Sequence, residues 1–399
     1  MNERLRKLCR RLGDEGVDAA LLLHPRDVLY CAGTARPASL LVISRGCAPD
    51  PSRPTTAGQA VLFVRRGLRH AAAEATIDRV ERMEGFSSVL AAMSAFGLRG
   101  GRLGTALDVV SAGLYLRLKD AFPQWELVDV SSLILNQRMV KDGGEVEATR
   151  RAARAADAGH RALPEAAAPG VSELDLAAHV EQATRRAGHE GYQPLRHPEA
   201  RGGGVLLMSG DNLAVRGGHG LVVTGAGLSA GSPYGPSRRL LREGDIIVLD
   251  IGTTCGGYTA DESRTFVVGQ PEREQKALFD ATRQTEDAVL ECLRPGVPVA
   301  EVYATAEVIV DRGARPVHEP GSLKLPGFVG HGIGLELDEP PIIWPRDRTV
   351  LQEGMVLAVE VEISAEERGM MTKLEDTVLI TSDGCEVLTN APRTLVQCR

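Results

Sequence analysis

Acidic residues interrupt long apolar stretches in the C-terminal part of this 399-residue chain. Asp250 lies within residues 246–252 (IIVLDIG), and Glu360 ends a second apolar stretch at 354–360 (GMVLAVE). Both stretches predict buried β-strands. Burying a carboxylate in such a strand is costly unless a cation or hydrogen-bond donors compensate its charge. The fold must therefore bring compensating groups to these acids.

Two further acids and a histidine lie in similar surroundings. Asp261 follows Asp250 by 11 residues (261 − 250), and the turn-like residues 255–257 (CGG) predict a hairpin that brings both carboxylates to one end of a sheet. His331 lies between glycines (GHGIG), which permit close approach of the backbone. Glu375 lies in KLEDT, directly before another apolar stretch.

Four carboxylates and one imidazole form a hard ligand set that suits Mn²⁺, Co²⁺, Fe²⁺ or Zn²⁺. Two such divalent ions sharing bridging carboxylates activate a water molecule and stabilise the oxyanion of a hydrolytic intermediate. The alternative is that each acid is an ion-paired or hydrogen-bonded structural residue of its strand. The candidate metal ligands are Asp250, Asp261, His331, Glu360 and Glu375.

The chain divides near residue 140. Before it, helix-like and strand-like segments alternate, with a predicted turn at Pro25, so residues 1–140 are expected to form a smaller α/β domain. Residues 141–144 (KDGG) resemble a hinge, and a long helical pattern follows them. In residues 141–399 strands and helices are segregated, which favours an α+β domain with a largely antiparallel sheet.

Charge and composition exclude several classes of function. The net charge of −7 argues against non-specific binding to nucleic acid or anionic membranes, and 4% aromatic residues leave little for base stacking. The apolar stretches fall short of the ~20 residues of a membrane span, and the first residues lack the apolar core of a secretory signal. Seven scattered cysteines without a Cys-x-x-Cys pair favour reduced thiols, so a cytoplasmic protein is expected.

The order of these residues resembles that of the pita-bread metallohydrolases, which include aminopeptidase P, prolidase, methionine aminopeptidase and creatinase. The shared pattern is Asp, a second Asp 11 residues later, Gly-His-Gly-Ile-Gly, Gly-Met-Val followed by Glu, and Glu-Asp-Thr. Residues 18–21 (DAAL) and 30–34 (YCAGT) are similar to the creatinase/prolidase N-terminal domain, and residues 138–145 are similar to its junction with the catalytic domain.

The resemblance implies a C-terminal pita-bread catalytic domain at 141–399 behind a creatinase-like N-terminal domain at 1–140. It implies that the five ligands hold two divalent metal ions and that Glu360 also carries a proton for the attacking water. A small peptide or small-molecule substrate and a homodimer are expected. Nucleic acid and membranes are not expected as partners.

Two histidines that these peptidases usually carry are missing. Residues 230–236 (AGSPYGP) contain no histidine where a Pro-His-Gly-like stretch is usual, and Asp338 lies seven residues after His331, where the second is usual. Those imidazoles donate hydrogen bonds to the substrate carbonyl or oxyanion, which an ionised Asp cannot do. Asp338 could instead hold a cationic substrate group, be protonated in a desolvated site, or form a structural ion pair.

Two other residues bear on this departure. His219, in the glycine-rich stretch 216–220 (RGGHG), is a candidate replacement donor, and the alternative is a solvated loop histidine. Lys373 lies where the peptidases often have Arg, and this exchange of a planar fork for a point charge predicts altered binding of a substrate carboxylate.

Three functions remain open. The leading one is a dinuclear-metal hydrolase of the Xaa-Pro aminopeptidase or prolidase type that cleaves a peptide or amide C–N bond. The second is a non-peptidase relative, creatinase-like or lyase-like, that acts on a small metabolite, including a cationic one; the missing histidines and Asp338 favour it. The third is an inactive binding protein, which the retention of all five ligands disfavours.

Overall fold

The structure is a computed structural model that describes residues 2–44, 59–191, 196, 204–216, 222–313 and 323–399. Its Cα positions divide the chain into two compact units, Met1–Arg138 and Met139–Arg399. None of the described helices combines the length and apolar character that crossing a membrane requires.

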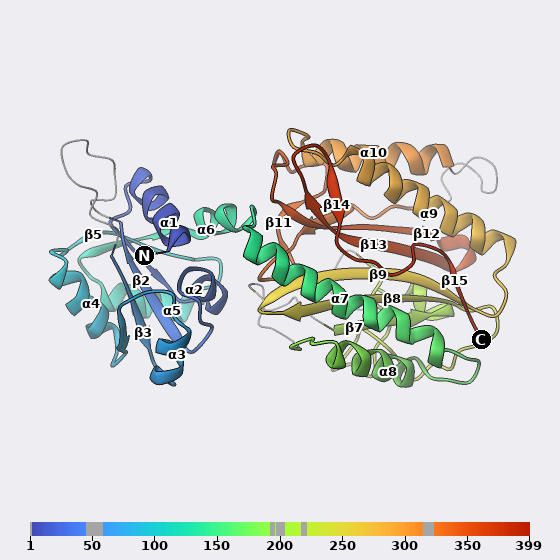
Figure 1. Ribbon diagram of the computed structural model, residues 1–399, viewed down its shortest axis with the longest axis horizontal. Helices are drawn as coiled ribbons and strands as arrows, with labels where there is room; N and C mark the ends of the chain where they lie inside the picture. Colours follow the sequence, from blue (N-terminus) through green and yellow to red (C-terminus); the bar gives the residue numbers. More distant parts are fainter. Residues whose placement is uncertain (1, 45–58, 192–195, 197–203, 217–221, 314–322) are drawn as a thin grey trace. The chain divides into compact units, whose positions relative to one another are not determined.

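The first unit is built on a six-stranded mixed sheet with the strand order β4-β3-β2-β1-β5-β6. Figure 1 labels β2, β3 and β5 of this sheet. β1 pairs antiparallel with β2 and parallel with β5. The strands are β1 (Ala19–Leu22), β2 (Ala38–Ile43), β3 (Gln59–Val64), β4 (Val80–Arg82), β5 (Gly101–Thr105) and β6 (Trp125–Asp129). The helices are α1 (Glu3–Asp14), α2 (Pro25–Ala32), α3 (Leu68–Glu74), α4 (Phe86–Ala95), α5 (Ala112–Ala121) and α6 (Ser131–Arg138).

The expected turn at Pro25 is wrong, because Pro25 is the first residue of α2. Proline suits this position since its fixed φ matches the helix and its missing N–H would have had no partner in the first turn. The helix ends at Gly33, which has a φ of 79° and donates its N–H to the carbonyl of Leu29.

The second unit contains a nine-stranded sheet with the main order β11-β10-β12-β13-β9-β8-β7, and β14 and β15 pair with β13 and β9. Apart from β15, its neighbouring strands pair antiparallel, which confirms the predicted α+β architecture. The strands are β7 (Gly204–Ser209), β8 (Ile246–Cys255), β9 (Tyr258–Val268), β10 (Gly330–Gly332), β11 (Glu339–Ile342), β12 (Val356–Ala365), β13 (Met370–Ile380), β14 (Cys385–Val387) and β15 (Val396–Cys398). The helices are α7 (Gly143–Ala166), α8 (Glu173–Arg186), α9 (Arg273–Cys292) and α10 (Val299–Gly313).

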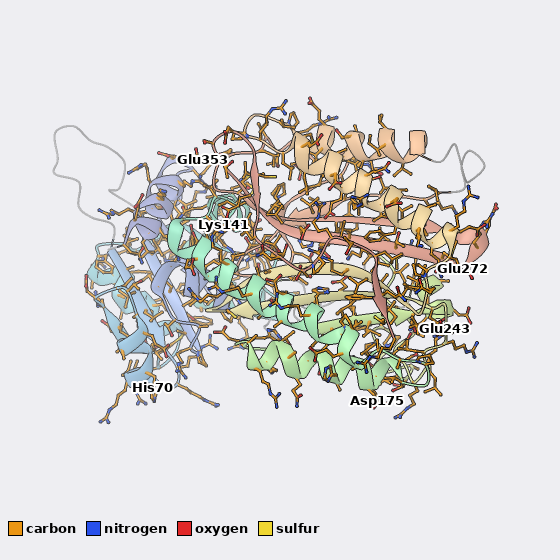
Figure 2. All side chains as sticks on the ribbon, turned by 45° about the vertical axis from the view of Figure 1, so that its right-hand side comes forward. His70, Lys141, Asp175, Glu243, Glu272 and Glu353 are labelled. Carbon is orange, nitrogen blue, oxygen red and sulfur yellow. The ribbon has the colours of Figure 1, made fainter. Side chains whose placement is uncertain are left out.

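Helix starts in this unit are fixed by side-chain caps. α7 begins after Asp142, which forms a capping box with Glu145. α9 begins after Glu272, which forms a second capping box with Gln275; Figure 2 shows Glu272 at this helix end. These reciprocal bonds satisfy backbone N–H groups that would otherwise lack partners.

The helices cover the apolar face of the second sheet. Leu249 and Ile251 of β8 pack with α7 and α8, and Leu357 and Val359 of β12 pack with α9 and α10 (Figure 1). Because successive side chains of a strand point to opposite faces, Asp250 of β8 and Glu360 of β12 project from the other face of the sheet. This other face carries the acidic side chains together with a smaller apolar cluster that includes Met208, Val248 and Met371.

A buried ion network lies behind the sheet's centre. The guanidinium of Arg264 is 2.6 Å from Asp376 and 2.9 Å from Glu262, and it donates hydrogen bonds to the carbonyls of Glu375 and Ala391. Arg264 is only 1% exposed. It thus ties β9 to the backbone of β13 and to the C-terminal segment.

Replacing Arg264 with Met should destabilise the second unit by about 3–5 kcal/mol, because it leaves the buried Glu262 without its guanidinium partner and Asp376 with Arg393 alone. In a unit of this size the loss corresponds to a melting temperature lower by about 10 °C. Calorimetry of the purified variant measures it. Arg154→Met is the matched control, since Arg154 pairs with Glu147 at an exposed surface and its loss should stay below about 1 kcal/mol. Equal effects of the two substitutions would contradict the structural role of Arg264.

Candidate metal centre

Strand register brings the candidate ligands of β8, β9 and β13 to one face. Asp250 lies opposite Ser263, and Gly252 lies opposite Asp261, so both acids project from the same side of the hairpin. Ser263 in turn lies opposite Glu375 on β13. The hairpin with its turn at 256–257 thus brings the first two acids together as predicted.

The same register adds the remaining candidates from β12 and β10. Glu360 lies directly opposite Glu375, and His331 lies opposite Ala358, two residues before Glu360. The glycine after His331 is required by packing: a Cβ at Gly332 would lie 2.1 Å from the carbonyl oxygen of Pro340. The five candidates therefore share one face of four neighbouring strands and the short β10.

Three of the five candidates form a compact ligand cluster. One ligand atom each of Asp261, His331 and Glu375 lies within 4.8 Å of the others, and all three residues are buried. Asp250 and Glu360 are buried too, at 8% and 6% exposure. A divalent cation is the usual partner of such a group of carboxylate and imidazole atoms.

The electrostatics of the cluster favour a bound cation. Burial, and then the carboxylates of Glu375 and Asp250, raise the pKa of Asp261 well above its ordinary value. Burial raises the pKa of Glu375 to about 8, with Lys373 opposing this shift. Among the described residues, Oε1 of Glu375 is a buried oxygen without a hydrogen-bond partner. This orphaned acceptor fits the ligand role.

His331 is oriented for metal binding by its own backbone. Its Nδ1 lies 3.0 Å from the carbonyl oxygen of Gly332, an acceptor, so Nδ1 carries the proton and Nε2 is left as the ligand atom. Burial lowers the pKa of His331, but the carboxylates of Asp338 and Glu360 more than offset this effect and the net shift is upward.

Lys373 is the residue whose position differs most from expectation. Its ammonium lies 2.7 Å from Asp250, 2.8 Å from Glu360 and 3.2 Å from Glu375. It therefore contacts the candidate ligands themselves, whereas the sequence suggested a partner for a substrate carboxylate. The residue is 3% exposed, and the surrounding carboxylates raise its pKa well above the ordinary value despite burial.

The other predicted site residues are placed as follows. Asp338 lies beside the cluster, with Oδ1 3.4 Å from Nε2 of His331 and a side chain 48% exposed. His219 lies outside the described residues. Residues 230–236 are described; their first part lies in a tight turn that is closed by pairing of Ser229 with Ser232.

Two hydroxyl residues of the cluster were missed from sequence. Ser263 donates a 2.6 Å hydrogen bond to Oε2 of Glu375, and the Thr377 hydroxyl both accepts from the backbone N–H of Asp261 and donates to its carbonyl. Each lies two residues from a candidate ligand, on the same face of its strand. That spacing was the available signal.

Known proteins resemble the chain over nearly its whole length. The model of metallopeptidase family M24 matches residues 147–382, and the creatinase/prolidase N-terminal domain matches residues 4–140. The chain is 32% identical to the probable dipeptidase PepE of Mycobacterium tuberculosis over 75% of this chain and 71% of that protein. It is 26% identical to the Xaa-Pro dipeptidase of Pyrococcus furiosus over 99% and 100% of the two chains.

Solved structures agree. The Xaa-Pro dipeptidase from Bacillus anthracis superposes with a TM-score of 0.82 at 24% identity and 99% coverage of both chains. The prolidase from Pyrococcus horikoshii gives 0.79 at 25% identity and covers 99% of this chain and 100% of that one. The five candidate ligands lie on one face of the sheet of an α+β unit, and this chain belongs to metallopeptidase family M24.

Proposed function

We propose that this protein is a divalent-metal-dependent hydrolase that cleaves the C–N bond of a small Xaa-Pro-type peptide. The observation that carries the proposal is the buried cluster of Asp261, His331 and Glu375, which sits in the family's catalytic domain. Relatives named Xaa-Pro dipeptidase and prolidase support the substrate class.

Each ligand residue has a proposed role. Asp261, His331 and Glu375 would hold a divalent ion, and Asp250 and Glu360 are candidate ligands on the same face of the sheet. The ion supplies Lewis-acid chemistry, lowering the pKa of a water and stabilising negative charge on the substrate oxygen. Glu360 accepts the proton of the attacking water and returns it to the leaving amine.

Finer features belong to the same proposal. The ion at Asp261, His331 and Glu375 is proposed to be Mn²⁺, Co²⁺, Fe²⁺ or Zn²⁺. Residues 1–140 and 141–399 are proposed as the N-terminal and catalytic domains, and a homodimer as the assembly. The described cysteines form no disulfide with one another, which supports a reducing, cytoplasmic compartment.

A specific observation favours a second candidate, a non-peptidase hydrolase or lyase for a small cationic metabolite. Asp338 is half-exposed beside the candidate ligand His331, so its carboxylate is available to a substrate cation. It offers no hydrogen-bond donor for an oxyanion when ionised. Both candidate functions use the same metal centre. They differ in the substrate pocket around it.

Replacing Glu375 with Gln should abolish metal binding and lower turnover of an Xaa-Pro dipeptide at least about 100-fold, because the cluster loses a charged ligand. Elemental analysis of the dialysed protein measures the first effect. Glu286→Gln is the matched control: it alters another buried acid, on α9, whose partner is Arg393 at 2.9 Å. Retained metal in the Glu375 variant would refute the ligand assignment.

The metal-free protein should lose stability as the pH rises. The folded-state pKa values of Asp261 and Glu375 lie above their ordinary ones, so the folded chain binds these protons more tightly than the unfolded chain. The stabilising contribution of Glu375 is full below about pH 4 and is lost as the pH rises through about 8. The contribution of Asp261 has the same sign. Melting temperatures of the chelator-treated wild type should fall more steeply between pH 5.5 and 8.5 than those of Glu375→Gln. Parallel curves would contradict this account.

Asp338→His should raise kcat/KM for Xaa-Pro dipeptides about tenfold or more, since it supplies an imidazole donor and removes a negative charge. Asp338→Ala removes the charge without adding the donor and should give a smaller gain. If neither variant gains activity over a dipeptide panel in the presence of Mn²⁺, the pocket serves another substrate and the second candidate is favoured.

A further inference from the structure

Lys373 brings a fixed positive charge into the metal centre. The ammonium has three N–H donors and lies within 3.2 Å of three carboxylates, those of Asp250, Glu360 and Glu375. Its side chain is 4% exposed, so protein groups rather than bulk water surround the charge. In this arrangement the lysine acts as a cation covalently attached to the site.

Strand geometry holds Lys373 on the ligand face. It precedes Glu375 by two residues on β13, and residues two apart in a strand project from the same side. Its cross-strand partner is Glu362, which follows Glu360 by two residues. A one-residue shift that removed Lys373 from this face would remove Glu375 with it.

The ammonium occupies space that a second metal ion would need. Oxygen ligands lie roughly 2.0–2.2 Å from a bound Zn²⁺ ion. An ion bound to Oδ2 of Asp250 and Oε2 of Glu360 would therefore overlap with the Lys373 nitrogen, which lies 2.7 Å and 2.8 Å from these two oxygens. The like charges would also repel each other at this short distance in a buried site.

The other part of the cluster is open to an ion. Oε2 of Glu375 faces Lys373 and Ser263, whereas its Oε1 has no hydrogen-bond partner among the described residues. Oε1 can therefore serve an ion shared with Asp261 and His331. The two oxygens of Glu375 thus face two different cations.

We propose that Lys373 replaces the second metal ion, so that this chain holds one divalent ion, at Asp261, His331 and Glu375, where five ligands would otherwise hold two. The inference rests on the proposed metal centre and specifies its composition. An arginine at this position is planar and pairs edge-on with a single carboxylate, whereas an ammonium is a compact point charge that fits among three.

Metal stoichiometry tests the inference without any assay of activity. Purified chain is loaded with excess Mn²⁺, dialysed, and analysed for manganese per chain, with the electron paramagnetic resonance spectrum distinguishing an isolated ion from a coupled pair. Wild type should hold one ion. Lys373→Met, of similar length without the charge, should hold two and give the spectrum of a coupled pair.

Lys141→Met is the matched control. Lys141 is also buried and ion-paired, with Glu339 at 3.4 Å, and Figure 2 shows it ahead of α7. Its loss should leave one ion per chain. If Lys373→Met does not fold, Lys373→Arg is the second variant, since it keeps the positive charge. It should also bind two ions, because the planar guanidinium is too large to occupy the position of a metal ion.

The outcomes separate this inference from the proposed function. Two ions in wild type, or one ion in the folded Lys373 variants, would overturn the inference and leave the metal-dependent hydrolase standing. No bound manganese in wild type and in both variants would overturn the proposed function itself.

Discussion

The arrangement of the second unit depends on compensating four carboxylates that project from one face of a buried sheet. Asp250, Asp261, Glu360 and Glu375 lie on neighbouring strands, and each is at most 8% exposed. Such a concentration of like charge is unstable without cations and donors. Lys373, Ser263 and the proposed metal ion supply them, so the chemistry of the site and the stability of the sheet have the same origin.

The opposite face of the same strands is organised around a second buried charge. Arg264 lies one residue after Ser263 and donates to the backbone carbonyl of Glu375 from behind. Hydrogen bonds on this face of the sheet thereby fix the positions of the candidate ligands on the opposite face. α7 and α9 then cover the apolar residues of this face.

Much of this architecture follows from the sequence because the pattern of acids and the strand period carry it. Asp250 and Asp261 are separated by a Cys-Gly-Gly turn, so a hairpin that aligns them is predictable from spacing alone. By contrast, β5 (GRLGT) has too few apolar residues to stand out as a strand, and Pro25 indicated a turn although it begins a helix. The contacts of Lys373 could not be predicted either, since they depend on the cross-strand register of β12 and β13.

Anomalous X-ray scattering from crystals loaded with Mn²⁺ tests the central claim most directly. The strongest anomalous peak should lie between the carboxylates of Asp261 and Glu375 and the Nε2 atom of His331. A peak at other residues, or no anomalous density at this cluster under saturating Mn²⁺, would contradict the assignment of these residues as the metal centre of the protein.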